Sequence, residues 1–118
     1  MAWNKHAAAL HARQNAGTSS QRRCGEFTRK AIRAGGVDIG NAPNAKDYGS
    51  NLERAGFRVL GQGEILQEGD VVVIQPYDGG NPAGNMAIYE GTNWYSDFRQ
   101  RDRWGGPGDR SAQTADKS

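Results

Sequence analysis

The feature that most constrains the fold is a run of β-branched residues, GDVVVIQPY, at residues 69–77. Valine and isoleucine favour extended backbone, and the run begins after Gly69-Asp70 and ends at Pro76. It therefore predicts a β-strand. Three further strands are expected, a short one in GFRVL and two joined by a short turn in MAIYEG and NWYSDF.

The first half of the chain is predicted to be helical. Residues 3–15 are rich in alanine, and NAKDYGSNLERAG (44–56) predicts a short helix with Tyr48, Leu52 and Ala55 on one side. Helices followed by an antiparallel meander are typical of an α+β domain. The 118 residues are sufficient for one such domain, residues 1–118, with a flexible tail from about Ser111 onward.

The most informative helix is predicted between the serines at 19–20, either of which is a suitable N-cap, and the glycines at 35–36, which end it. Its apolar positions recur with helical spacing and form an inward stripe, while basic residues and Glu26 occupy the opposite face. The stripe consists of Cys24, Phe27, Thr28, Ala31 and Ile32. The single cysteine of the chain thus lies in the first turns of an amphipathic helix.

Composition excludes several classes of protein. One cysteine and two histidines rule out an internal disulfide and argue against a structural zinc site. No apolar run reaches the roughly 18 residues of a membrane span, and the N-terminus lacks a Sec-type signal, so neither membrane insertion nor Sec export is expected. Residues 1–58 carry ten basic and four acidic side chains, but the aromatic residues of the predicted sheet, Tyr89, Trp94 and Tyr95, do not interleave with these basic residues. We expect a solvated helix face and no nucleic-acid partner.

Polar residues are expected to meet at the predicted hairpin. With residues 90–92 as its loop, Tyr89 faces Asn93, and Asn85 lies across from Asp97. Asn85, Ala87 and Tyr89 share one face of the sheet, which is expected to pack against the Cys24 helix. A cysteine, a polar residue and a carboxylate in this layout indicate a thiol-protease site. Alternatively, Asn85 only forms hydrogen bonds in a glycine-rich turn.

Three segments together resemble the CHAP and NlpC-type cell-wall amidases, which are papain-like cysteine peptidases that hydrolyse amide bonds in peptidoglycan. They are the run from Ser20 to Phe27, GDVVVIQPY, and GNMAIYEGTNWYSDF. The resemblance covers roughly residues 18–104. It implies a papain-like small domain in which N-terminal helices pack on an antiparallel β-sheet and a thioester forms at the nucleophile, Cys24.

The resemblance also implies the remaining site residues. Asp97 matches the third residue, which orients the catalytic imidazole; the alternative is a strand-end carboxylate paired with Arg99 or Arg101. The backbone N–H of Cys24 is the expected oxyanion donor, and Ser20 and Gln21 help to shape that pocket. We expect the helix N-terminus, Arg22 and Arg23 to favour the thiolate. The alternative for Cys24 is a small buried apolar residue.

Position 85 departs from the family pattern. The family has its general-base histidine there, and the carboxamide of Asn85 does not titrate near neutral pH and cannot take the thiol proton. His6 and His11 lie upstream and have no catalytic place in the resemblance. Three explanations stay open: a deliberate inactivating substitution, a naturally inactive relative kept for binding, or a base elsewhere in the chain.

The resemblance finally implies partners and location. Expected partners are a peptide of peptidoglycan as substrate and an immunity protein that blocks the cleft; no metal or organic cofactor is implied, and the chain is expected to be a monomer. As an antibacterial effector it would act in the periplasm or cell wall of a target bacterium after specialised export. The rival hypothesis is an inactive module that binds the cell wall or a partner. Trp104 either lines the substrate groove or covers the core.

Overall fold

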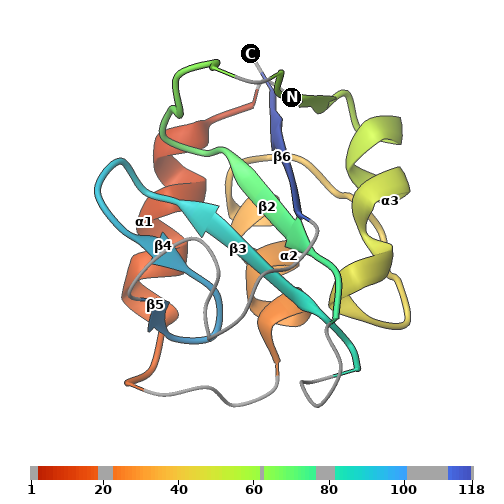
Figure 1. The fold of residues 1–118 in the computed structure, drawn as a ribbon. Helices are drawn as coiled ribbons and strands as arrows, with labels where there is room; N and C mark the ends of the chain where they lie inside the picture. Colours follow the sequence, from red (N-terminus) through yellow and green to blue (C-terminus); the bar gives the residue numbers. More distant parts are fainter. Residues whose placement is uncertain (1–2, 19–22, 62, 77–81, 101–111, 118) are drawn as a thin grey trace.

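The computed structural model describes residues 3–18, 23–61, 63–76, 82–100 and 112–117. Figure 1 shows a single sheet with α1 and α2 behind it and α3 at one side. This is the α+β architecture expected from the sequence, with N-terminal helices on an antiparallel sheet. The elements are α1 (Lys5–Asn15), α2 (Cys24–Ala34), η1 (Ala45–Asp47), α3 (Gly49–Arg54), β1 (Arg58–Val59), β2 (Val71–Ile74), β3 (Asn85–Tyr89), β4 (Trp94–Tyr95), β5 (Arg99–Gln100) and β6 (Ala112–Asp116).

Helix α2 begins and ends as its sequence indicates, except at the N-cap. Its N-cap is Arg23, so Cys24 is the first helical residue, and the two serines expected to cap it lie outside the described residues. At the other end Gly36 adopts a left-handed φ of 98°, and the N–H of Val37 donates to the carbonyl of Ile32 at 3.3 Å. This is the turn that a glycine permits after a helix.

The sheet has the order β1-β6-β2-β3-β4-β5, and the pairings are antiparallel. Strand β2 is buried along its whole length because both of its faces are covered. Val71 and Val73 join the core under the helices, whereas Val72 and Ile74 join a smaller cluster with Trp94 on the other face. The predicted strand is therefore confirmed, and it forms the centre of the sheet.

The predicted flexible tail is wrong for residues 112–116. These residues form β6, which is inserted between β1 and β2 and pairs with both. Its sequence, AQTAD, contains one β-branched residue, whereas all four residues of β2 are β-branched. Strand β6 forms because its backbone N–H and C=O groups pair with those of β1 and β2. The pattern of side chains in the sequence does not reveal such pairing.

The hairpin register is shifted by one residue from the prediction. Tyr89 pairs with Trp94, not with Asn93, and the N–H of Glu90 donates to the carbonyl of Asn93 at 3.0 Å. The predicted second strand also breaks after Tyr95, because β5 folds back to pair with β4. The prediction that Asn85 lies across from Asp97 in a ladder is therefore wrong; Asp97 occupies the turn between β4 and β5.

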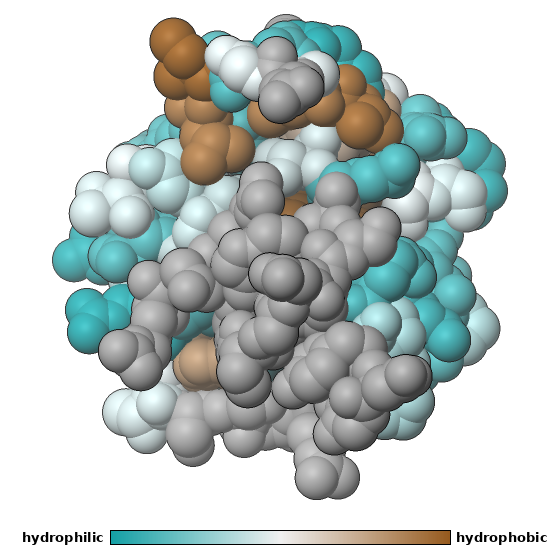
Figure 2. Space-filling view, in the orientation of Figure 1, coloured by the Kyte–Doolittle hydropathy of each residue, from teal (hydrophilic) through white to brown (hydrophobic). Residues whose placement is uncertain are grey.

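Large apolar side chains are exposed mainly between β1 and β2. They are Val59, Ile65 and Leu66, with Leu10 on α1. Figure 2 shows apolar residues gathered at the top of the view, over the segment that follows β1, whereas α2 begins at the bottom of Figure 1. In the described part of the chain, no helix is long and apolar enough to cross a bilayer.

Two carboxyl groups meet where β6 joins the sheet. Asp70 is 1% exposed and Asp116 is 6% exposed. The Oδ2 of Asp70 accepts from the N–H of Gln67 at 2.9 Å, while no donor in the described part of the chain reaches its buried Oδ1. Burial, and then the neighbouring carboxyl of Asp116, raise the pKa of Asp70 to about 7. Asp70 therefore holds its proton in the folded state, and losing it places a buried negative charge beside Asp116.

This pair predicts a stability that falls as the pH rises. The folded-state pKa of Asp70 lies above its ordinary value of about 3.9, so the stabilising proton is lost as the pH rises through about 7. We expect the free energy of unfolding to decrease by on the order of 2 to 4 kcal/mol between about pH 4 and about pH 8. Urea denaturation followed by tryptophan fluorescence measures it. The Asp70→Asn variant should flatten the curve and exceed the parent near pH 8, whereas exposed Asp47→Asn should not. A parent curve that rises over this range contradicts the prediction.

Candidate active site

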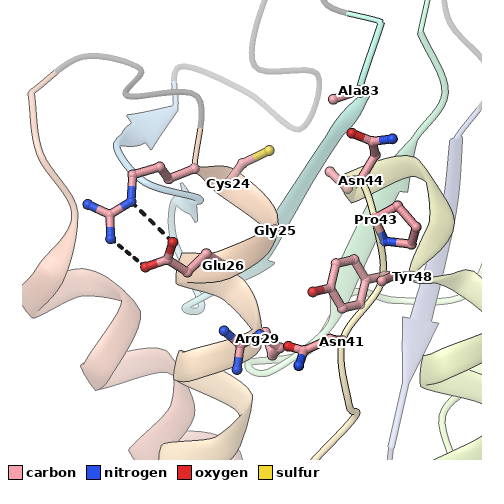
Figure 3. Close-up of a pocket in the computed structure, with 12 residues that line it drawn as sticks. Cys24, Gly25, Glu26, Arg29, Asn41, Pro43, Asn44, Tyr48 and Ala83 are labelled. Atoms are coloured by element: carbon pink, nitrogen blue, oxygen red, sulfur yellow. Dashed lines mark hydrogen bonds and ion pairs between the residues drawn. The ribbon is translucent and has the colours of Figure 1, made fainter.

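A cleft of about 330 Å³ opens beside the first turns of α2 (Figure 3). One wall is α2, and the other is the segment from Asn41 to Tyr48 with Ala83. In Figure 3 the sulfur of Cys24 points toward this second wall. The lining residues are Arg23, Cys24, Gly25, Glu26, Arg29, Asn41, Ala42, Pro43, Asn44, Ala45, Tyr48 and Ala83.

The second wall is tied to the start of β3. The N–H of Lys46 donates to the carbonyl of Ala83 at 2.9 Å. Gly84 follows with a φ of +74°, and a Cβ there would lie 2.4 Å from the carbonyl oxygen of Ile74. Only glycine fits this position, so the turn that leads to Asn85 is held close to β2.

Helix α2 docks on the backbone of Met86, the second residue of β3. The Thr28 hydroxyl donates to the carbonyl oxygen of Met86 at 3.2 Å. The N–H of Met86 interacts with the Cys24 thiol. Both groups of one residue point to the same side of an extended strand. Two side chains one helical turn apart therefore satisfy the backbone of Met86, which no described strand pairs on that side. They place the half-buried sulfur at the start of β3.

The expectation that the thiolate is favoured is wrong. Burial raises the pKa of the Cys24 thiol above its usual value, and the negative charge of Asp97 raises it further, against the opposing backbone N–H groups of Met86, Gly25 and Cys24 itself. The guanidinium of Arg23 does not compensate, because its Nε donates to Glu26 Oε1 at 3.2 Å. Arg22 lies outside the described residues.

Asn85 lies at the start of β3, next to the residue that contacts Cys24. It shares a sheet face with Ala87 as predicted, but that face is turned away from the helices. The core under the helices contains Met86 and Ile88 instead. The carboxamide of Asn85 donates from Nδ2 to Gln100 Oε1 at 3.1 Å.

Asp97 is fully buried at the other side of the α2 N-terminus. Its Oδ2 accepts from the N–H of Arg23, the N-cap residue, at 2.9 Å, and its Oδ1 accepts from the Ser96 hydroxyl at 3.2 Å. Its backbone carbonyl accepts from the N–H of Gly17 at 2.8 Å. A carboxylate at a helix N-terminus is electrostatically favourable, so Asp97 fixes where α2 begins.

The structure thus gathers the three predicted residues around one end of α2, with contacts that differ from the prediction. The sequence did not predict the role of Gln100, which accepts a hydrogen bond from the side chain at position 85. Gln100 is brought there because β5 folds back beside β4, and no local sequence pattern indicates this. No histidine is found among the described residues that line the cleft. His6 contacts Glu68 at 3.0 Å, and His11 is also on α1. Ser20, Gln21, Arg101 and Trp104 lie outside the described residues.

Among the described residues, the arrangement brings a thiol to the cleft without a titratable side chain hydrogen-bonded to it. The N–H groups of the first turn of α2, those of Cys24 and Gly25, point toward the sulfur and have no acceptor one turn earlier within the helix. Such groups can stabilise a negative oxygen that forms next to the sulfur. The site is therefore suited to attack on a carbonyl once a group is present that can take the thiol proton.

No protein-family model and no curated protein sequence matches the chain. Two solved structures match it closely. The chain is 39% identical to a chain of the type VI native effector–immunity complex Tae3–Tai3 from Ralstonia pickettii, with a TM-score of 0.90, and the match covers 98% of this chain and 100% of that one. For the selenomethionine form of this complex the identity is 40%, the TM-score 0.86, and the coverage 92% and 98%. On this likeness over nearly the full length of both chains, the protein belongs to the type VI effector–immunity family represented by Tae3–Tai3.

Proposed function

We propose that the chain is the effector of such a pair, built as a cysteine-dependent amidase that hydrolyses amide bonds in bacterial peptidoglycan. The observation that carries this proposal is the half-buried thiol at the first residue of α2, opening on a polar cleft. A protein that only blocks another molecule's site has no need of a thiol surrounded by backbone N–H groups. The resemblance to the CHAP and NlpC-type amidases supports the same reading.

The proposed reaction passes through a thioester. Position 85 precedes Met86, whose backbone contacts the thiol, so we propose that a base at this end of β3 reaches Cys24 although Ala87 packs on the face away from the helices. This base takes the Cys24 proton, the sulfur attacks the substrate carbonyl, and the first-turn N–H groups of α2 stabilise the oxyanion. The base then gives its proton to the departing amine, and water hydrolyses the thioester. Asn85 can neither accept nor return that proton. We therefore infer that the chain as it stands turns over slowly, since loss of a general base costs on the order of 10² to 10⁴ in rate.

Gln100 and Asp97 have separate roles in this proposal. Gln100 Oε1 already accepts a hydrogen bond from the side chain at position 85, so it would hold an imidazole there by its second nitrogen. Asp97 accepts from the backbone of Arg23 and positions the helix that bears the nucleophile. The orienting role that the resemblance gives to Asp97 is thus shared with, or taken by, Gln100.

The likeness to effector–immunity complexes supports an immunity protein as partner, and we propose that it covers the cleft. Binding of this kind depends on the shape and charge of the cleft, not on the base. The site of action would be the periplasm or cell wall of a target bacterium, reached through a type VI machine. The chain is proposed to act as a monomer.

A second candidate is an inactive module that binds the cell wall or a partner through the same cleft. Two observations favour it: Asn85 stands where the base is needed, and the pKa of the thiol is raised. The two candidates differ in one respect, which is whether the remainder of the catalytic apparatus works when a base is supplied.

Asn85→His is the variant that separates these candidates. We expect it to release new amines from purified peptidoglycan at least about 10²-fold faster than the parent chain, because the imidazole supplies the missing proton transfer. Chromatography of the released fragments and an amine assay measure the rate.

The matched control is the double variant Asn85→His with Cys24→Ala, which keeps the new imidazole and lacks the nucleophile. It should be as slow as the parent. If Asn85→His releases nothing beyond this control while its circular dichroism and unfolding curve are those of the parent, the amidase proposal is wrong and the binding module stands.

The reactivity of the thiol gives an independent prediction. Because burial and then Asp97 raise the pKa of Cys24, alkylation by iodoacetamide in the parent chain should reach half of its maximal rate above the usual value of about pH 8.5. In Asn85→His the midpoint should fall below that value, since an imidazolium beside the sulfur stabilises the thiolate. Cys24 is the only cysteine, so labelling reports on one site. An unchanged midpoint in the histidine variant contradicts the proposed proximity of positions 24 and 85.

The role of Gln100 is tested in the Asn85→His background. Gln100→Leu should lower kcat by about tenfold and shift the acidic limb of the pH–rate profile, because the imidazole loses the acceptor that fixes its tautomer. Arg99→Gln, at the exposed neighbouring position, is the control and should leave both unchanged. If Gln100→Leu changes neither while Asp97→Asn changes both, the orienting role belongs to Asp97.

A further inference from the structure

The cleft contains the guanidinium of Arg29, which takes no part in the proposed reaction. Arg29 lies five residues after Cys24 on α2, about 7.5 Å further along the helix axis. It lines the cleft and is half-buried. The other basic side chains of α2 have acidic neighbours: Lys30 binds Glu26 at 2.8 Å, and Arg33 lies 3.7 Å from Asp38. Within the described residues, no acidic side chain pairs with Arg29.

The acidic side chain of the cleft does not neutralise Arg29. Glu26 is bound by both Arg23 and Lys30. These hydrogen bonds lower the pKa of Glu26 to about 2, so it stays ionised and committed to its two partners. Two cations on one carboxylate leave this part of α2 positively charged even before Arg29 is counted, which favours an anionic ligand.

The facing wall supplies neutral hydrogen-bonding groups. Asn41, Asn44 and Tyr48 line it, and Figure 3 shows the Tyr48 hydroxyl pointing across the cleft toward α2. Tyr48 is held in place by its burial, with 4% exposure, and by its approach to Gly25, where a Cβ would lie 3.1 Å from Tyr48 Cε2. A fixed polar wall opposite a cation suits a peptide, whose backbone needs hydrogen-bond partners on both sides.

We propose that Arg29 binds a carboxylate of an acidic peptide substrate, about two residues away from the amide bond that Cys24 attacks. An extended peptide advances roughly 3.4 Å per residue, so the axial distance from Cys24 to Arg29 spans about two residues. A planar guanidinium matches a carboxylate through two parallel hydrogen bonds. The inference rests on the proposed function, and it makes Arg29 a specificity-determining residue that acts in binding.

The test measures binding by the parent chain, which does not require turnover. The probes are a soluble peptide released from purified peptidoglycan and the same peptide after its carboxylates are converted into carboxamides. Arg29→Gln should weaken binding of the acidic peptide by about tenfold to a hundredfold, the loss expected for a charge-assisted hydrogen bond. It should leave binding of the amidated peptide unchanged. Arg33→Gln, one turn further along α2 and outside the cleft, is the matched control and should affect neither.

The outcomes separate this inference from the proposed function. If Arg29→Gln binds the acidic peptide as the parent does, or if the parent prefers the amidated peptide, the carboxylate subsite is wrong even where Asn85→His cleaves peptidoglycan. If binding depends on Arg29 and Asn85→His cleaves nothing, the subsite stands and the amidase proposal fails. In a cleaving Asn85→His background, Arg29→Gln should raise KM with little change in kcat.

Discussion

The site depends on the anchoring of one helix end to a distant turn. Asp97, fully buried between β4 and β5, accepts the N–H of Arg23 and so determines where α2 begins. Thr28, one turn into the helix, then binds the carbonyl of Met86 on β3. These two contacts, one to the turn between β4 and β5 and one to β3, oppose sliding or rotation of α2. The sulfur of Cys24 is placed at the start of β3 by these contacts more than by any contact of its own.

The carboxylate of Asp97, which anchors α2, also disfavours ionisation of the Cys24 thiol. No cationic side chain among the described residues offsets this effect. A buried carboxylate near a half-buried thiol disfavours a second negative charge, and the pKa of Cys24 is raised accordingly. A cation between Cys24 and Asp97 would remove this electrostatic penalty, because a positive charge stabilises both the thiolate and the carboxylate. The carboxamide of Asn85 carries no charge, and Arg23 is committed to Glu26. The electrostatics of the site would therefore favour a cationic side chain, such as an imidazolium, between Cys24 and Asp97.

Local patterns in the sequence were sufficient for α2 and β2, and insufficient for β5, β6 and the pairing of the strands. The β-branched run and the helical stripe headed by Cys24 predict β2 and α2 correctly, because burial of apolar side chains decides both. The tail was misread because β6 is held by backbone hydrogen bonds and carries few apolar side chains. The one-residue error in the hairpin arose because the loop has four residues, which no residue preference distinguished from three. Because of that error, the predicted partner of Asn85 was Asp97 and Gln100 was not considered. The sequence indicated three residues that the structure places near the start of α2, but not their contacts.

In the proposed function, proton transfer and peptide binding depend on different elements of the fold. An asparagine at position 85 would therefore affect the first and not the second. In the proposed reaction, proton transfer depends on the first residue of β3, whereas the cleft is formed by α2 and the segment from Asn41 to Tyr48. Asn85 does not line that cleft, and its own hydrogen bond runs to Gln100 on the opposite face. Under the proposed mechanism, the residue at 85 governs proton transfer, while Tyr48 and Arg29 line the cleft. A chain with asparagine at 85 would then still present these cleft residues to a peptide or to a protein that competes with it.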